Sequence, residues 1–452
     1  MPLIVRTNDS HEAAIESLAG VRARSLEATL EMVPRGCRLE HYDKVAVPEF
    51  KISGQITAYA SPDSTFAVTK TLLDAAKKTI LIGIYDFTAG YVADLLKDAI
   101  VRGVKVTLML DTDHVKGEDE LFKDLSDHGA TCVPAPSCAS KRAHFFRSSH
   151  EKVVVIDGET CLIQSGNFSK NSIPMNVKDG VDDNSFRTGN RDMGVAVSSK
   201  ELAKFLTNIL NSDMKLELDA PEGLGHAFLN PPPMLVEAAP SKRPAKIFPS
   251  KTFKLASPIS VQPILSPDNY MTTIPAALRK AKKSILIQQQ YIHSGDEAIA
   301  ELLQAIADAS KGSTTFDVRI LLGKLFDNKA LAKEKENLQN IADKFGLKIS
   351  RNIRYVDTTR LVHCHNKLLI IDGKTVLVSS QNWSKAAVLE NRETGLLFEH
   401  KGVASYFTDI FESDWAVGQK KLPAQIGSGG ASPEMLKRGG FIEVAAADYQ
   451  EV

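Results

Sequence analysis

The sequence of 452 residues predicts an α/β protein made of two duplicated α/β/α sandwich lobes, with mixed sheets and an active site between the lobes. First, residues 61–82 align without gaps with residues 266–287, at an offset of 205, and the two segments share ten identities. Second, helix-like and strand-like segments alternate through both halves, which is typical of helices packed on a sheet. Third, a proline-rich stretch separates the halves. These observations together indicate an internal duplication.

Each copy is expected to begin with a helix that ends in a pair of lysines and leads into a buried strand. In the first copy the lysines are Lys77 and Lys78, and apolar residues 80–82 follow them. Apolar residues then recur at helical spacing, which predicts a second helix that leads into a strand over residues 104–110, or 318–322 in the second copy. The helical positions are Val92, Leu95, Leu96, Ala99 and Ile100 in the first copy and Ile299, Leu302, Leu303 and Ile306 in the second.

Proline content sets the domain boundaries. Ten of the 20 prolines lie between residues 221 and 267, where they exclude a long helix or a central strand. We therefore expect five segments, which are an N-terminal helical extension over 1–54, a first lobe over 55–218, a proline-rich linker over 219–257, a second lobe over 258–420 and a C-terminal tail over 421–452.

Composition and charge exclude several classes of protein. Hydrophobic residues make up 43% of the chain and charged residues 24%, as in globular proteins, so the chain is neither disordered nor a coiled coil. The 55 Lys and Arg residues equal the 55 Asp and Glu residues, so no overall charge attracts nucleic acid or an anionic membrane. No apolar run is long enough to span a membrane. We expect a monomer. The first residues lack a secretory signal pattern, so we expect a cytoplasmic protein, or a secreted or periplasmic one if a signal peptide was removed.

The five cysteines do not predict a disulfide framework, because they are odd in number and thinly spread through a large chain. Cys132 and Cys138 could pair in an exported protein. Two buried thiols are the simpler expectation, since free cysteine is among the most buried residue types.

One motif occurs once in each copy, in the same register. A His is followed by Lys two residues later, Asp at seven, Gly at eight, Ser at 15 and Asn at 17. A chance match to six fixed residues is expected on the order of once in a hundred thousand chains of this length, so two matches are not an accident. The residues are His150, Lys152, Asp157, Gly158, Ser165 and Asn167 in the first copy and His365, Lys367, Asp372, Gly373, Ser380 and Asn382 in the second.

The spacing of this motif predicts a hairpin that presents polar groups on one surface. His150 and Lys152 share one face of a strand, because side chains alternate between faces. The Asp157-Gly158 pair predicts a tight turn, so Ser165 and Asn167 return beside them. Two facing hairpins would surround a tetrahedral anion with donors, as the transition state of a phosphodiester requires. For Asp157, and for Asp372 in the second copy, a structural role in the turn is expected instead.

At these motifs the sequence resembles the phospholipase D superfamily, which is marked by an HxKxxxxD signature followed by a GSxN-like segment. The resemblance covers roughly residues 55–420, and the chain differs where the Gly of GSxN would stand, with Gln164 and Ser379. It implies a two-lobe phosphodiesterase with His150 as the nucleophile that forms a phosphohistidine and His365 as the acid. The sequence alone does not choose between the two histidines.

A second repeated segment supplies candidate partners for the histidines. Residues 190–194 read NRDMG and residues 391–395 read NRETG. A catalytic histidine works best when a carboxylate accepts a hydrogen bond from its other ring nitrogen, which makes Asp192 and Glu393 the candidates. The resemblance implies the same role for an acidic residue downstream of each motif. The alternative is a surface salt bridge with the adjacent arginine.

The remaining polar residues of the motifs are expected to bind substrate. Lys152, Lys367, Asn167 and Asn382 should hold the non-bridging oxygens of the phosphate, with Ser165 and Ser380 assisting. No metal and no other cofactor is expected, because Asp and His residues do not cluster at metal-ligand spacing elsewhere. His144 and His363 are expected to support the site or to pack in the core. The first copy has 24 positions from Asn167 to Arg191 where the second has 10, which predicts an acidic loop near the site that gates substrate or is solvated.

Three functions remain open from the sequence. The two-motif architecture and the neutral charge favour a phospholipid head-group hydrolase or transphosphatidylase in peripheral contact with a membrane. Four aromatic residues beside the motifs could line an apolar approach or pack in the core. Residues 82–90 and 102–110 look like the nuclease branch of the superfamily, which makes nucleic acid the alternative substrate. A catalytically silent phosphate-binding module is disfavoured because both motifs are intact. The aromatic residues are Phe145, Phe146, Phe168 and Trp383.

Overall fold

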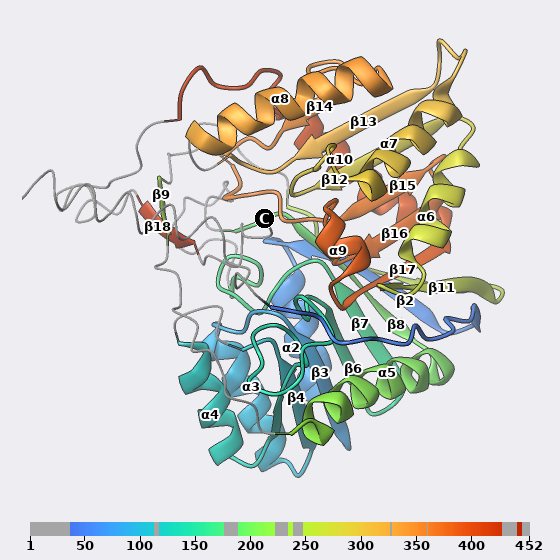
Figure 1. Cartoon of the computed structure of the whole chain (residues 1–452). Helices are drawn as coiled ribbons and strands as arrows, with labels where there is room; N and C mark the ends of the chain where they lie inside the picture. The colour runs from blue at the N-terminus through green and yellow to red at the C-terminus, as the bar shows by residue number, and fades with distance from the viewer. Residues whose placement is uncertain are drawn as a thin grey trace, which may run out of the picture.

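A computed structural model describes residues 37–112, 117–175, 189–221, 234–237, 247–325, 328–358, 360–426 and 441–444. Two lobes are stacked on one another, and each has an eight-stranded mixed sheet between layers of helices (Figure 1). This confirms the predicted duplication of an α/β/α sandwich.

The first lobe contains eleven elements of secondary structure in the described part of the chain. They are β2 (Gln55–Ser61), α2 (Thr65–Ala75), β3 (Thr79–Ile84), α3 (Gly90–Val101), β4 (Lys105–Leu110), α4 (Glu118–Asp127), β5 (Thr131–Pro134), β6 (Lys152–Ile156), β7 (Thr160–Gln164), β8 (Asp192–Ser198) and α5 (Lys200–Asp219). Helix α5 packs on the opposite face of the sheet from α2 and α3 (Figure 1).

The second lobe repeats this order with one additional short helix. Its elements are β11 (Ile259–Ser266), α6 (Tyr270–Arg279), β12 (Ser284–Gln289), α7 (Glu297–Ser310), β13 (Asp317–Leu322), α8 (Asn328–Phe345), β14 (Ile353–Tyr355), β15 (Leu368–Ile371), β16 (Thr375–Ser379), α9 (Lys385–Leu389), β17 (Glu393–Glu399) and α10 (Lys401–Val417). A separate pair of strands, β9 (Met234–Glu237) and β18 (Phe441–Val444), joins the linker region to the C-terminal region.

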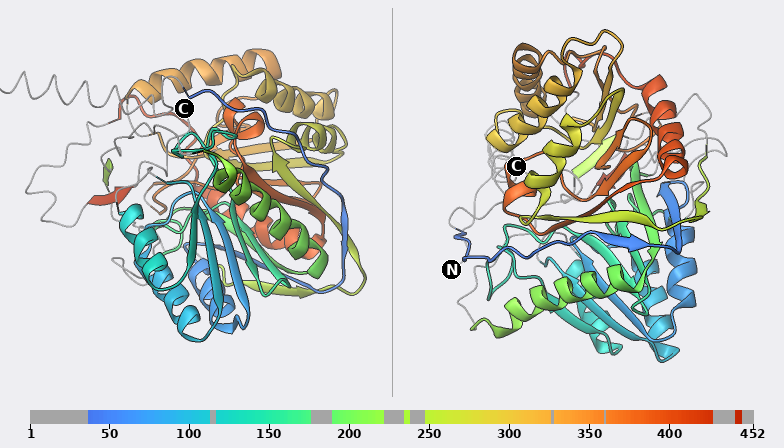
Figure 2. Two further views of the ribbon diagram at one scale, coloured as in Figure 1. Left: turned by 60° about the horizontal axis from the view of Figure 1, so that its bottom comes forward. Right: turned by 90° about the vertical axis from the view of Figure 1, so that its right-hand side faces the viewer.

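The two sheets have the same strand order and exchange their edge strands. The first sheet runs β10-β2-β8-β7-β6-β3-β4-β5 and the second β1-β11-β17-β16-β15-β12-β13-β14. Strand β1 (Phe50–Ile52) precedes the first lobe but pairs with β11 of the second, and β10 (Lys251–Lys254) precedes the second lobe but pairs with β2 of the first. The segment that leads to β1, blue in Figure 2, therefore runs across both lobes.

Buried apolar side chains join the lobes. One cluster combines Val155 and Leu206 of the first lobe with Ile370 and Phe407 of the second. Strand β7 also contacts β16 and β17. Because burying apolar surface is the main stabilising contribution to folding, this shared core holds the two lobes in a fixed relation.

Several expectations need correction or fall partly outside the described residues. Helix α2 ends at Ala75, before Lys77 and Lys78, because the main-chain N–H groups of both lysines turn to donate to the carboxylate of Asp157. The helical extension expected over 1–54 is described only from residue 37, and residues 37–49 contain no helix before β1. No helix in the described part of the chain is long and apolar enough to cross a membrane.

The cysteine pairing differs from the expectation. Cys138 forms a disulfide with Cys37, with a Cα–Cα distance of 5.9 Å, and not with Cys132. Cys132, Cys161 and Cys364 are free thiols. The bond ties the N-terminal segment to the first lobe, upstream of the point where β1 joins the second.

Candidate active site

Each motif forms the predicted hairpin. Strands β6 and β7 pair antiparallel, as do β15 and β16, so that the Ser and Asn of each motif return beside the His and Lys. His150, Lys152, His365 and Lys367 are all buried where the two lobes meet.

The histidines are paired crosswise between the lobes. Nδ1 of His150 lies 2.9 Å from Oε2 of Glu393, which belongs to the second lobe. Nδ1 of His365 lies 3.0 Å from Oδ1 of Asp192, which belongs to the first. Each pair joins a residue of one lobe to a residue of the other, so the two motifs make one site. The alternative of a surface salt bridge with the adjacent arginine is wrong, because Asp192 and Glu393 are both buried.

Each motif lysine donates to the main chain of the histidine two residues before it. Nζ of Lys152 donates to the carbonyl oxygen of His150 at 2.7 Å and lies 5.2 Å from the centre of the Tyr85 ring. Nζ of Lys367 donates to the carbonyl oxygen of His365 at 2.7 Å and lies 3.0 Å from Nε2 of that histidine. Because an ammonium group has no lone pair, Nε2 of His365 must accept this hydrogen bond.

The protonation of the His365–Asp192 pair follows from these contacts. Burial and the positive charge of Lys367 lower the pKa of His365 to about 4, despite the opposing carboxylate of Asp192. Burial alone would raise the pKa of Asp192, but His365, Lys367 and Ser165 outweigh it and lower the pKa to about 2. His365 is therefore neutral, with its proton on Nδ1 and a lone pair on Nε2, and Asp192 is ionised.

Tyr85 and Gln290 belong to the site although the sequence reasoning did not single them out. The Tyr85 ring packs edge-on against the His150 ring, with 4.6 Å between ring centres. The side-chain oxygen of Gln290 lies 3.5 Å from Nζ of Lys367. The two residues occupy equivalent places in the repeat, at the same offset of 205, and this offset was the signal that could have identified them.

Asn167 and the two motif serines differ in their side-chain hydrogen bonds. Both polar atoms of the Asn167 side chain are buried and make no hydrogen bond with the described residues, which leaves them able to contact a phosphate. Ser165 instead donates to Asp192 at 2.8 Å, and Ser380 accepts from the N–H of Thr394 at 3.0 Å. The serines thus hold the strands that carry the acidic residues.

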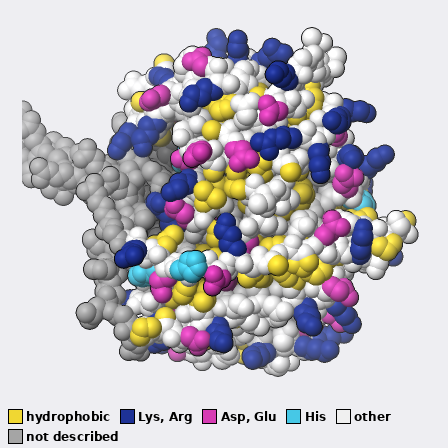
Figure 3. Space-filling model, turned by 45° about the vertical axis from the view of Figure 1, so that its right-hand side comes forward, with side chains coloured by type: hydrophobic (Ala, Val, Ile, Leu, Met, Phe, Trp, Pro, Cys, Tyr) yellow, Lys and Arg dark blue, Asp and Glu magenta, His cyan; other side chains and the backbone are white. Residues whose placement is uncertain are grey.

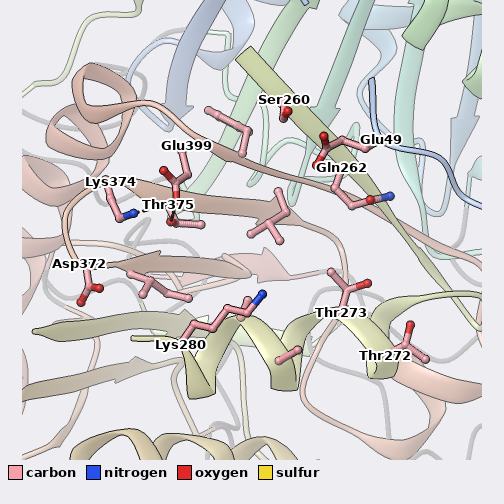
Figure 4. A pocket seen from close by; sticks show the side chains of 15 residues that line it. Glu49, Ser260, Gln262, Thr272, Thr273, Lys280, Asp372, Lys374, Thr375 and Glu399 are labelled. Carbon is pink, nitrogen blue, oxygen red and sulfur yellow. Dashed lines mark hydrogen bonds and ion pairs between the residues drawn. The ribbon is translucent and has the colours of Figure 1, made fainter. Parts of the chain in front are cut away.

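The repeated spacing of the motif also includes two aspartates that lie outside the site. Asp157 accepts hydrogen bonds from the N–H groups of residues 77–79, and Asp372 accepts them from residues 282–284. Each lies at the far end of its strand from the histidine. Asp372 also borders an open pocket of about 580 Å³ between α6 and the sheet of the second lobe, which none of the motif histidines, lysines or asparagines lines (Figure 4).

The other sequence candidates are placed around the site. Nδ1 of His363 accepts from the N–H of Lys324 at 2.9 Å, beside His365, whereas Nε2 of His144 contacts the Ser140 carbonyl oxygen at 2.9 Å. The acidic part of the predicted loop, Asp179 to Asp183, lies outside the described residues. No group of three or more His, Cys, Asp and Glu side chains in the described ranges could hold a metal ion.

Most of the aromatic residues beside the motifs pack in the core and do not line a lipid path. Phe146, Phe168 and Trp383 are fully buried. The ring of Phe168 contacts Phe87, and Nε1 of Trp383 donates to the Tyr270 hydroxyl at 3.0 Å.

Glu151 lies between His150 and Lys152, and its burial predicts a measurable pH dependence of the free energy of unfolding. Burial and the carboxylate of Asp213 raise the pKa of Glu151 to about 8 from 4.5. Between these two pH values the unfolded chain releases this proton and the folded chain keeps it, so the group lowers stability as pH rises. Glu151→Gln removes the effect, and the variant should gain on the wild type by up to about 1.4 kcal/mol per pH unit in urea denaturation between pH 5 and 7.5. If the free energy of unfolding changed with pH equally in the wild type and in Glu151→Gln, this prediction would be wrong. Glu159→Gln, at an exposed glutamate, is the control and should follow the wild type.

The duplicated lobes and the shared site with two His–Lys pairs define a protein of the phospholipase D superfamily. The chain belongs to the family described as cardiolipin synthase, PLD-like domain, whose model matches residues 69–214 and 274–415. No curated protein matches the sequence.

Among solved structures that are similar to the chain, all at low sequence identity, one shows the same fold over most of its length. Phosphatidylserine synthase of Haemophilus influenzae is similar over 89% of this chain and 92% of its own, with 16% identity and a TM-score of 0.56. Nuc of Salmonella typhimurium, a phospholipase D family member, matches 37% of this chain and 96% of its own, with 20% identity and a TM-score of 0.30. NucT of Helicobacter pylori matches 36% of this chain and 99% of its own, with 17% identity and a TM-score of 0.29.

Proposed function

We propose that the protein cleaves the head-group phosphodiester of a phospholipid, passing the phosphatidyl group to water or to an alcohol. The observation that carries this proposal is the crosswise pairing of His150 with Glu393 and of His365 with Asp192 in one buried site. A double displacement at phosphorus needs a nucleophile and an acid on opposite sides of one phosphate. Two oriented histidines from different lobes supply both.

The reaction proceeds in two balanced steps. In the first, Nε2 of one histidine attacks phosphorus, the bond from phosphorus to the head-group oxygen breaks, and the other histidine donates its proton to that oxygen. In the second, this other histidine takes a proton from water or an alcohol, whose oxygen attacks phosphorus and releases the first histidine. Lys152, Lys367 and the two motif asparagines hold the non-bridging oxygens throughout.

We propose His365 as the nucleophile, which is the reverse of the order that the family resemblance implies. A nucleophilic histidine must be neutral at Nε2, and Lys367 and Asp192 hold His365 in that form. His150, on the other side of the phosphate, then supplies and recovers the proton.

Charge and family support a lipid over a nucleic acid. A nuclease tracks a polyanion through many phosphate contacts, which calls for a basic surface. The chain has equal numbers of basic and acidic residues. On the face in Figure 3, Lys and Arg side chains lie scattered among Asp and Glu and form no continuous basic stripe. The matching family is described by cardiolipin synthase, whose name refers to a phospholipid.

We propose that the protein works in an oxidising compartment. The disulfide between Cys37 and Cys138 supports an oxidising compartment, since such bonds persist in secreted and periplasmic proteins. It favours the exported alternative over a cytoplasmic one.

The purified chain incubated with phosphatidylcholine vesicles should release choline and leave phosphatidic acid. Added ethanol should compete with water and give phosphatidylethanol. Single-stranded and duplex DNA and RNA should be cut poorly at physiological salt, and His365→Ala serves as the inactive control. Efficient degradation of nucleic acid, with no head group released from phosphatidylcholine, phosphatidylglycerol or phosphatidylethanolamine, would overturn the lipid substrate.

Turnover should persist in EDTA, because the ammonium groups of Lys152 and Lys367 take the part that a Lewis-acid metal plays in two-metal enzymes. The measurement is head-group release before and after prolonged dialysis against the chelator. Loss of activity that one divalent ion restores would contradict this expectation.

A further inference from the structure

The arginines that precede the two acidic residues reach across from one lobe to the other. Arg191, in the first lobe, donates through Nε and Nη2 to both carboxylate oxygens of Asp414 on α10, at 2.8 and 3.1 Å. Arg392, in the second lobe, donates in the same way to Asp213 on α5, at 2.8 and 2.9 Å. The two side chains are 2% and 1% exposed, so these are buried, forked ion pairs.

Each of these arginines has a second anchor in the repeated Ser-Pro-Asp segment of its own lobe. Nη1 of Arg191 donates to the Ser61 carbonyl oxygen at 2.8 Å and to Asp63 at 3.0 Å. Nη1 of Arg392 reaches the Ser266 carbonyl oxygen at 3.3 Å and Asp268 at 2.7 Å. The proposed chemistry does not use the Ser-Pro-Asp repeat. In each lobe this segment binds the guanidinium group of the arginine.

The main chain of each arginine is fixed against the motif of the opposite lobe. The N–H of Arg191 donates to the His363 carbonyl oxygen at 2.8 Å, and its own carbonyl oxygen accepts from the N–H of His365 at 3.0 Å. In the other lobe, Arg392 donates to the Ser148 carbonyl oxygen at 2.9 Å and accepts from the N–H of His150 at 2.7 Å. Side chain and main chain therefore fix the residue that directly precedes each histidine-binding carboxylate.

We propose that Arg191 and Arg392 are positioning residues that act crosswise, Arg191 holding Asp192 on His365 and Arg392 holding Glu393 on His150. Neither arginine contacts a reacting atom. Arg191 links Asp414 of the second lobe to Asp192, which orients His365 of the second lobe. Arg392 links Asp213 of the first lobe to Glu393, which orients His150 of the first lobe. The contacts that dock the lobes therefore also orient the histidines. The effect of these arginines on turnover depends on the proposed two-histidine reaction. Their effect on the orientation of the histidines does not depend on it.

The test compares Arg191→Lys and Arg392→Lys, which keep the charge but lose the planar fork. Arg319→Lys is the matched control, because Arg319 forks onto Glu412 at 2.7 Å for each bond within the second lobe and does not contact the motifs. The first readout is the nitrogen-15 NMR spectrum of histidine-labelled protein, assigned with His150→Ala and His365→Ala. Arg191→Lys should shift the ring signals of His365 and leave those of His150, and Arg392→Lys should do the reverse.

The second readout is the kinetics of bis(4-nitrophenyl) phosphate cleavage. Each motif-linked variant should lower kcat by about 10²-fold with KM little changed, the size expected for a displaced catalytic group. Arg319→Lys should keep the wild-type kcat.

If a lysine variant does not fold, Asp414→Asn and Asp213→Asn replace it, since each removes one partner of a single arginine and should give the same crosswise NMR pattern. Equal shifts at both histidines in each variant, or no shift at either, would overturn the proposal. If no phospholipid is cleaved, the proposed function fails, while the NMR pattern still decides the role of the arginines.

Discussion

Alanine at either His150 or His365 should lower turnover by at least about 10³-fold, and the double variant should be no worse than the more damaged single variant. The reason is that the two histidines are halves of one reaction, held on one phosphate by partners from opposite lobes. The measurement is head-group release or bis(4-nitrophenyl) phosphate cleavage under single-turnover conditions. His128→Ala, at the exposed end of α4, is the control and should keep full activity. A single variant that retains half the activity would show two independent sites.

Asp192→Asn should lower kcat by about 10²- to 10⁴-fold with little change in KM, by analogy with loss of the orienting carboxylate in a catalytic triad. The carboxylate accepts the Nδ1 proton of His365, whereas an amide can donate to Nδ1 and so favour the tautomer in which Nε2 carries the proton. A histidine in that tautomer has no lone pair for the phosphorus.

Asp157→Asn supplies the matched control for this variant. It makes the same chemical change at an aspartate of the motif that binds only the main chain of its own lobe. It should lower the free energy of unfolding and keep the kcat of the folded protein. An unchanged kcat in Asp192→Asn would exclude Asp192 from orienting His365.

Much of the fold was predictable because the duplication repeats local signals. The helix and strand periodicities recur in both halves, and the turn at Asp157-Gly158 fixes which side chains share a face of the hairpin. The presence of the same polar set in two copies was enough to predict one composite site.

The crosswise pairing could not be predicted, because spacing within one copy does not say which lobe supplies the partner. Asp192 is closer in sequence to His150 than to His365, yet it binds His365. The exchange of β1 and β10 could not be predicted for a related reason. Both strands are short, and their partner strands lie some 200 residues away in the sequence. The pairing of Cys37 with Cys138 depends in turn on the path of that N-terminal segment over the first lobe.

The central claim is that both motifs serve one phosphate through one covalent histidine, and mapping of that intermediate tests it most directly. The protein is mixed with phosphatidylcholine vesicles, quenched under alkaline conditions within milliseconds to seconds, and digested for mass spectrometry. We expect a phosphatidyl adduct on His365 in the wild type, little of it in His150→Ala, which lacks the acid that protonates the leaving head group, and none in His365→Ala. An adduct on His150 alone would reverse the two roles, and adducts on both histidines, or on neither, would contradict the single shared site.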